Sequence, residues 1–158
     1  MIYAPAVVEK NIRSVVGNNM QDFSKKMTIV VREDIASWQL TNTVGHIAAY
    51  LGNKMSAPFD TGKYFASSDG LDFPRNSQFP LVVLSSSKNN LEDLSLKLRD
   101  SDLLWIVYVQ EMIDMTNDDE IAESLKNISS QAMDILGIGI FGAKEKLKEF
   151  TGAFKLWK

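Results

Sequence analysis

The sequence predicts an α/β protein with a largely parallel sheet. Short apolar segments rich in β-branched residues alternate along the chain with segments of helical periodicity. The length of 158 residues fits one domain, and shares of 45% hydrophobic and 23% charged residues are typical of a soluble globular protein. We expect a leader at residues 1–25, with a short helix around Val7–Val16, and a single domain at residues 26–158.

The strands and helices of this domain are expected in alternating order. The strands are predicted at Lys26–Arg32, Phe79–Leu84, Leu103–Val109, within Ala132–Ile140 and at Ala153–Trp157. The helices are predicted at about Ala36–Asn53, Leu91–Leu98, from Asn117 or Asp118 to about Ile128, and at Lys144–Phe150. Candidate caps for the first two helices are Asp34 and then Asn89 or Asn90. Residues 57–78 are rich in Gly, Ser, Asp and Pro and are expected to form a long loop, either functional or mobile.

Composition excludes several classes of site. The chain has no cysteine, so disulfides, thiolate catalysis and Cys-ligated zinc are impossible. It has one histidine, so a site built from several histidines cannot form within one chain, and no metal or cofactor is expected. The net charge of −3 and pI of about 5.2 give no general basic field for nucleic acid, and DNA is not an expected partner.

The chain shows no sign of a membrane segment. No apolar run approaches the roughly 18–20 residues that span a bilayer. The N-terminal residues have no basic stretch before their apolar ones, and Glu9, Lys10 and Arg13 follow quickly, so no signal peptide is expected. We therefore expect a cytoplasmic protein that does not bind membranes.

The first predicted helix has two unusual faces. Its apolar stripe, expected to face the sheet, consists of Leu40, Val44, Ile47, Ala48 and Leu51. The opposite face holds Trp38, Asn42, Gly45 and Ala49, with no charged residue between Ile35 and Leu51. An exposed helix face is normally charged, so a second cover is expected here. It could be a pocket built on Trp38, Gln39, Asn42 and His46, a homodimer contact, or packing against the leader or the long loop.

A glycine motif near the C-terminus matches G-x-G-x-x-G at Gly137, Gly139 and Gly142. A dinucleotide fingerprint opens a βαβ unit of about 30 residues with an acidic residue about 20 positions further on. Only 16 residues follow Gly142 in 158, and none of the final FKLWK is acidic. We interpret the glycines instead as residues that allow a tight turn from strand to helix.

The same segment resembles the C-terminal end of type II peptidyl-tRNA hydrolases. Leu136–Gly139 matches the start of their L-G-I-G-P turn, and Thr151–Leu156 matches their T-G-x-L-K-L strand in order and spacing. "MTIVVREDI" resembles the V-V-R-x-D-L at the end of their first strand. The chain is most similar to an uncharacterised bacterial branch of this superfamily, whose W-Q-x-x-N helix and F-P-V-V-V-L-S strand are matched by "ASWQLTN" and "FPLVVLS".

The resemblance, which runs from about Lys26 to Lys158, implies a three-layer α/β/α sandwich. Its sheet would be small and mixed, mostly parallel, with four to five strands. The family's enzymes cleave the ester between a peptide and its tRNA with lysines and a glutamine on the first helix. In this chain the lysine positions hold Gln39 and Thr41, and the glutamine position holds Gly45. The resemblance therefore implies a hydrolase with an altered, uncharged site, if it is an enzyme.

Candidate site residues follow from this resemblance and from the ends of the predicted strands, where α/β proteins place their sites. The candidate catalytic residues are Asp114, Asn42, Gln39 and Thr116, with Glu111 as a second candidate base. The candidate substrate-binding residues are Trp38, His46, Arg32 and Ser85. The ligand would be a small molecule or derived from tRNA, under a lid formed by residues 57–78. The alternative is a non-catalytic binding or homodimeric assembly module.

Overall fold

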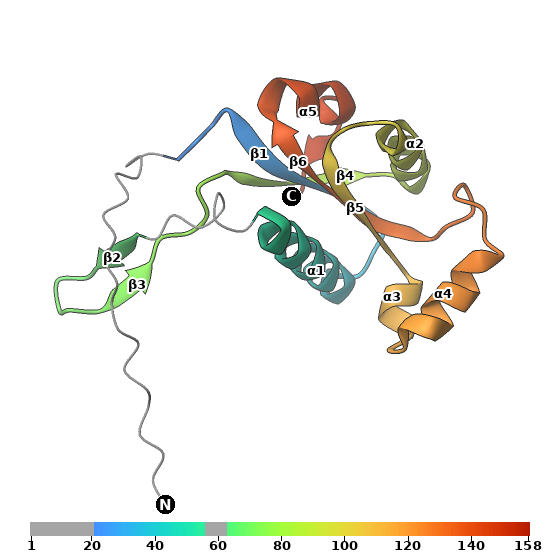
Figure 1. Cartoon of the computed structure of the whole chain (residues 1–158), viewed down its shortest axis with the longest axis horizontal. Helices are drawn as coiled ribbons and strands as arrows, with labels where there is room; N and C mark the ends of the chain where they lie inside the picture. Colours follow the sequence, from blue (N-terminus) through green and yellow to red (C-terminus); the bar gives the residue numbers. More distant parts are fainter. Residues whose placement is uncertain (1–20, 56–62) are drawn as a thin grey trace, which may run out of the picture.

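The computed structural model describes residues 21–55 and 63–158, in which a five-stranded sheet has the order β5-β6-β1-β4-β7 (Figure 1). The strands are β1 (Lys25–Arg32), β4 (Leu81–Ser86), β5 (Leu104–Val109), β6 (Ile135–Ala143) and β7 (Lys155–Leu156). All five predicted strands exist, and none of their ends is displaced by more than three residues. The predicted helix at Val7–Val16 lies outside the described residues.

The sheet is mixed, but the expectation that it is mostly parallel was wrong. β1 and β4 are parallel, whereas the pairs β1–β6, β5–β6 and β4–β7 are antiparallel. A parallel pair needs a connection that crosses a face of the sheet. The helices between β5 and β6 instead stay at one edge, so β6 runs back beside β5. Alternation of strands and helices in the sequence does not distinguish these two connections.

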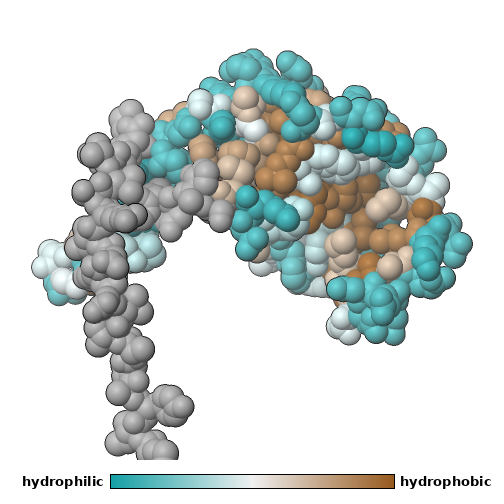
Figure 2. All heavy atoms as spheres, viewed as in Figure 1, coloured by the Kyte–Doolittle hydropathy of each residue, from teal (hydrophilic) through white to brown (hydrophobic). Residues whose placement is uncertain are grey.

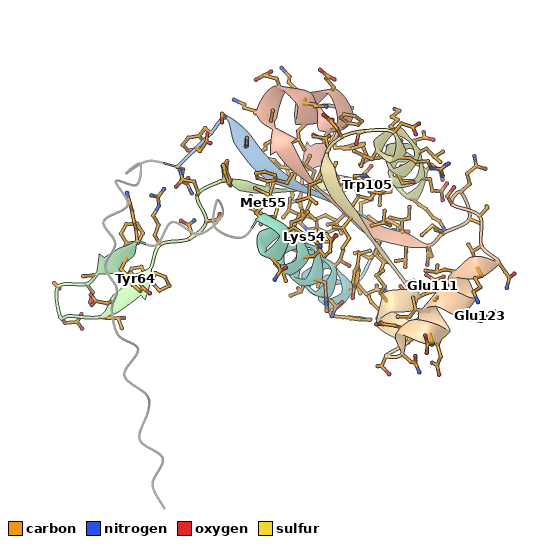
Figure 3. All side chains as sticks on the ribbon, in the orientation of Figure 1. Lys54, Met55, Tyr64, Trp105, Glu111 and Glu123 are labelled. Carbon is orange, nitrogen blue, oxygen red and sulfur yellow. The ribbon has the colours of Figure 1, made fainter. Side chains whose placement is uncertain are left out.

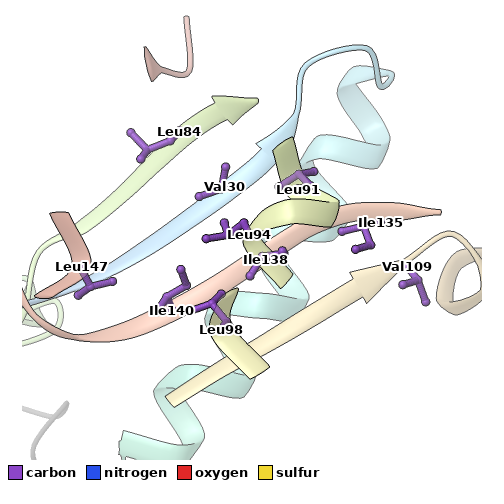
Figure 4. Close-up of a cluster of buried hydrophobic side chains, with 10 residues drawn as sticks. All are labelled: Val30, Leu84, Leu91, Leu94, Leu98, Val109, Ile135, Ile138, Ile140 and Leu147. Atoms are coloured by element: carbon purple, nitrogen blue, oxygen red, sulfur yellow. The ribbon is translucent and has the colours of Figure 1, made fainter. Parts of the chain in front are cut away.

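Helices cover both faces of the sheet, which makes three layers (Figure 1). Helix α1 (Ser37–Met55) packs on one face, where Ile47 and Leu51 are fully buried against β1 and β6. Helices α2 (Lys88–Arg99) and α5 (Lys144–Thr151) cover the other face around the hydrophobic cluster in Figure 4. Across the described ranges, no helix is long and apolar enough to cross a membrane.

Two short helices extend from the edge of the sheet between β5 and β6. Helix α4 (Asp118–Lys126) begins as predicted, because Asn117 Oδ1 accepts a hydrogen bond of 2.9 Å from the Asp119 N–H. Helix α3 (Glu111–Asp114) was not predicted, since four residues are too few for a periodic pattern. Together they form the lower right end of the molecule in Figure 1.

Two predicted helix caps were wrong. Ser87 caps α2, with Oγ 3.5 Å from the Asn90 N–H, so the helix begins before Asn89 and includes it and Asn90. Asp34 lies three residues before the start of α1 and pairs with Arg32. Instead, the Ala36 N–H donates a hydrogen bond to Gln39 Oε1, 3.0 Å away. This is the bond that the third helical residue of a capping box accepts from the backbone N–H of the N-cap residue.

The predicted loop at residues 57–78 contains a hairpin. Strands β2 (Tyr64–Ala66) and β3 (Asp72–Pro74) pair antiparallel, and Gly70 in their connection has a φ of 92°. The hairpin points away from the main sheet (Figure 1), which leaves Tyr64 and Phe65 exposed. A strand of three residues surrounded by turn-forming residues is too short to show the alternation of apolar and polar residues that identifies a strand in a sequence.

The glycines of the G-x-G-x-x-G motif lie inside β6 and do not form a turn, so our interpretation of them was wrong. A Cβ on Gly139 would lie 2.1 Å from Ile47 Cγ2 and 2.9 Å from Leu51 Cδ1. A Cβ on Gly137 would lie 2.7 Å from Thr43 Cγ2. These glycines therefore allow α1 to lie unusually close to the sheet.

Replacing Gly139 with alanine should destabilise the protein. The added methyl group would force α1 away from β6, and overpacking of this kind costs about 1–3 kcal/mol of unfolding free energy. Gly45→Ala is the matched control, because Gly45 lies in α1 with open space around its Cβ position. Alanine's higher helix propensity should make that variant as stable as the wild type or up to about 1 kcal/mol more stable.

Urea denaturation of the two variants measures both effects. A Gly139→Ala variant as stable as the wild type would show that α1 does not need this close approach.

Candidate functional site

Polar side chains gather at one edge of the main sheet. Because β1, β4 and β5 run in the same direction and β6 runs opposite, the carboxyl ends of the first three meet the start of β6. The strand ends bring together Arg32, Ser86, Gln110 and Asp134, which come from four segments distant in sequence. This is the edge at which the sequence predicted a site.

A hollow of about 670 Å³ opens beside this edge, between α1, β5, α3 and α4. We call it the Tyr108 hollow; it is lined by His46, Tyr108, Met112, Met115, Thr116, Asp118, Ile121, Ala122 and Leu125. In Figure 2, brown hydrophobic surface reaches the lower right of the molecule and meets the teal surface of α3 and α4 there. The volume is in the range of small-molecule sites, which are typically apolar with a few polar groups.

Two residues that line the Tyr108 hollow, Tyr108 and His46, form a set with Asn42 of α1. The Tyr108 hydroxyl donates a hydrogen bond of 2.8 Å to Asn42 Oδ1. The His46 ring stacks on the Tyr108 ring, with centroids 5.3 Å apart and planes 15° from parallel. Asn42 and His46 lie one turn apart on α1, so the helix presents both to the same ring. A shallower groove on α1 continues from His46 over Asn42 and Gly45.

The Tyr108 phenol is a hydrogen-bond donor in this set. Burial raises the pKa of Tyr108 above its usual value, because the charged phenolate loses solvation. The hydroxyl therefore stays protonated at neutral pH and its proton is directed to Asn42. Tyr108 can orient a bound group but does not supply an anionic nucleophile.

A second polar row lies at the end of β5. Gln39 Nε2 donates to Gln110 Oε1 over 3.1 Å, and Gln110 Nε2 donates to Asp114 Oδ1 over 2.8 Å. Two candidate catalytic residues, Gln39 and Asp114, are thus joined through Gln110. The Asp114 carboxylate is exposed, so it can accept a hydrogen bond from solvent or from a ligand.

Arg32 belongs to a separate ion cluster. Its guanidinium Nη1 lies 2.5 Å from Asp134 Oδ1, and Lys88 Nζ lies 3.2 Å from the same oxygen. Arg32 Nε lies 2.6 Å from Asp34 Oδ1 but without hydrogen-bond geometry, so that contact is a charge pair. Arg32 has only 13% of its side chain exposed and none of these four residues lines the Tyr108 hollow. The cluster ties the start of β6 to β1 and α2.

The remaining candidate residues lie at different places. Thr116 lines the Tyr108 hollow. Trp38 is 60% exposed on α1, where a homodimer contact was predicted and stays a prediction. Ser85 lines a different hollow of about 380 Å³ beside β7. No residue of the described range 63–78 lines the Tyr108 hollow, and the rest of the predicted lid lies outside the described residues.

Sequence reasoning missed most of the residues that line this hollow. Tyr108 was assigned to a buried strand, although a tyrosine among otherwise apolar strand residues signals a hydroxyl that needs a hydrogen-bond partner. Met112 and Met115 lie three residues apart on either side of Asp114, but this spacing alone does not identify a helix of four residues. In the described part of the chain, no three His, Asp or Glu side chains are placed to hold a metal ion.

Comparisons with known proteins give a family and a fold. The family described as "Protein of unknown function (DUF2000)" matches residues 25–158. No curated protein matches the chain. Among solved structures, a protein of unknown function from Agrobacterium tumefaciens strain C58 has a TM-score of 0.75 at 18% identity, covering 87% of this chain and 100% of that one. That similarity supports the fold alone.

The Arg32–Asp134 pair predicts a pH-dependent contribution to stability. Partial burial acts to raise the pKa of Asp134, but hydrogen bonds and charges from Arg32 and Lys88 outweigh it and hold that pKa below its usual value. The contribution should be fully present above the unfolded aspartate pKa, about 3.9, and lost as pH falls through the lower folded pKa.

Urea denaturation at pH 7 and pH 3 of wild type and Asp134→Asn measures this contribution. We expect the variant to lose about 1 kcal/mol at pH 7, a modest value because Asp134 is 39% exposed and solvent screens the pair. The difference in unfolding free energy between wild type and variant should shrink at pH 3. The control variant Asp93→Asn, on the exposed surface, should show no such decrease between pH 7 and pH 3. A difference that is constant or larger at pH 3 would contradict the account.

Proposed function

Because the chain belongs to the DUF2000 family, a family of unknown function, we propose its function from the site: it binds a small molecule in the Tyr108 hollow. The observation that carries this proposal is the hollow itself. Its volume of about 670 Å³, its five apolar lining residues and its polar wall at Tyr108 fit a ligand with an apolar body. The protein would be a peptidyl-tRNA hydrolase II-like fold used for binding.

Two features support binding over hydrolysis of peptidyl-tRNA. The positions that resemble the lysine positions of those enzymes hold Gln39 and Thr41, and both side chains are already engaged within the protein. Gln39 bonds to Gln110 and Ala36, and the Thr41 hydroxyl donates to the Ser37 carbonyl over 2.9 Å. Neutral, engaged side chains do not hold phosphate or stabilise developing negative charge as lysines do.

Thr116, a candidate catalytic residue, also lacks a base. Among the described residues, no carboxylate or imidazole forms a hydrogen bond with the Thr116 hydroxyl. The Asp114 carboxylate accepts a hydrogen bond from Gln110 Nε2. This bond orients the carboxylate toward Gln110 and not toward a nucleophile. The same polar row is nevertheless the observation that favours the second candidate function, a hydrolase with an altered, uncharged site.

A neutral apolar probe tests the binding proposal. Titration of protein carrying ¹³C-methyl methionine with 1-hexanol should shift the signals of Met112 and Met115, which line the hollow. The signal of Met27, which is 0% exposed in the core, should not move. The variant Ala122→Trp fills the hollow and should weaken binding about tenfold or more, which corresponds to at least about 1.4 kcal/mol.

The matched control is Ala66→Trp, in the exposed strand β2 and away from the hollow. It should bind 1-hexanol as the wild type does. If Ala122→Trp binds the probe with unchanged affinity, the Tyr108 hollow is not the binding site.

Hydrolysis of N-blocked aminoacyl-tRNA at low salt tests the second candidate. With an authentic type II enzyme as the positive control, we expect no turnover from this protein. Turnover that Asp114→Ala abolishes, while the variant keeps its fold by circular dichroism, would instead favour the hydrolase.

A further inference from the structure

Negative charge is concentrated around the Tyr108 hollow. Residues 110–126 contain six acidic residues and one basic residue, a net charge of −5, whereas the whole chain has a net charge of −3. The rest of the chain is therefore net positive. Figure 3 labels two of the six acids, Glu111 and Glu123, at the end of the molecule formed by α3 and α4. A ligand approaching this end meets a negative field.

Among the described residues 21–55 and 63–158, no Lys or Arg lines this hollow. Lys126, the basic residue of this segment, is paired with Glu123 over 2.5 Å. Lys54 is the only cation of α1 and lies at the opposite end of that helix from α3 and α4 (Figure 3).

One carboxylate lines the hollow without a partner. Asp118 is the first residue of α4 and lines the hollow. Within the described ranges, no side chain donates a hydrogen bond to its carboxylate or forms an ion pair with it. The lining also includes the thioethers of Met112 and Met115 and the ring of Tyr108 stacked on His46. Thioethers adapt to irregular apolar groups, and aromatic rings attract cations.

From this arrangement we propose that the ligand of the Tyr108 hollow is a hydrophobic organic cation, an amine on an apolar chain or ring. This inference rests on the proposed binding function. The ammonium group lies at Asp118, and the apolar body lies on Met112, Ile121 and Leu125. An anion of the same size is rejected by the surrounding field, and a neutral molecule gains the apolar contact without the charge-assisted hydrogen bond.

Three probes with the same six-carbon chain test this proposal: hexylamine, 1-hexanol and hexanoate. At pH 7.5 the amine is a cation, as a lysine side chain with a pKa of about 10.4 is. We expect hexylamine to bind about tenfold more tightly than 1-hexanol, and hexanoate to bind most weakly, with Kd values from the Met112 and Met115 methyl signals.

A pair of isosteric variants locates the charge contact. Asp118→Asn should remove the preference for hexylamine over 1-hexanol, measured as the ratio of the two Kd values in the same variant. Asp119→Asn is the matched control, because Asp119 lies in the same turn of α4 but does not line the hollow. It should retain most of the preference.

The outcomes separate this inference from the proposed function. If none of the three probes shifts Met112 and Met115, the binding function itself fails. If all three bind equally, or if Asp118→Asn keeps the preference, the hollow binds ligands but the organic-cation inference is wrong. An equal loss of preference in Asp119→Asn would overturn the direct contact with Asp118.

Discussion

The close contact between helix α1 and strand β6 is the constraint on which the rest of the structure depends. Gly137 and Gly139 present no side chain to α1, so Thr43, Ile47 and Leu51 occupy the space directly above them. This contact fixes both the height of α1 and its rotation about its own axis. Tyr108 is paired with Gly137 in the sheet, so its ring lies beside the place where α1 comes closest. A bulkier residue in β6 would lift the helix away from that ring.

The geometry of the site is a consequence of this packing. Once Thr43 and Ile47 are fixed against β6, their neighbours Asn42 and His46 must face Tyr108 from the adjacent side of α1. The apolar floor of the hollow comes from α3 and α4, which have few contacts with the sheet and are held by the strand they follow and by the Arg32–Asp134 cluster at the start of β6. One side of the hollow, formed by α1 and β5, is therefore fixed by the core, whereas the other side, formed by α3 and α4, lies at the periphery. Substitutions in α4 should alter the site with little effect on the fold.

Much of the fold could be predicted from the sequence, because strands and long helices carry periodic patterns. The buried stripe of α1, centred on Ile47 and Leu51, is an example. The direction of β6 could not be predicted, because strand patterns are the same in either direction. The glycines of β6 were misinterpreted because the gap they leave exists only when α1 is packed above them. Asn42 and His46 were recognised as unusual on a helix face, but Tyr108, their common partner, is 62 residues or more away in sequence and its contact depends on that same packing.

The most direct test of this account is the affinity of the Tyr108 hollow in a Gly137→Ala variant. The new methyl group would press on Thr43 Cγ2, a group that does not line the hollow. If the α1–β6 contact positions the site, 1-hexanol should bind at least severalfold more weakly, and the nuclear Overhauser contact between the His46 and Tyr108 rings should weaken, in a protein that remains folded. Wild-type affinity together with an unchanged ring contact would show that the site does not depend on this packing, and would contradict the account.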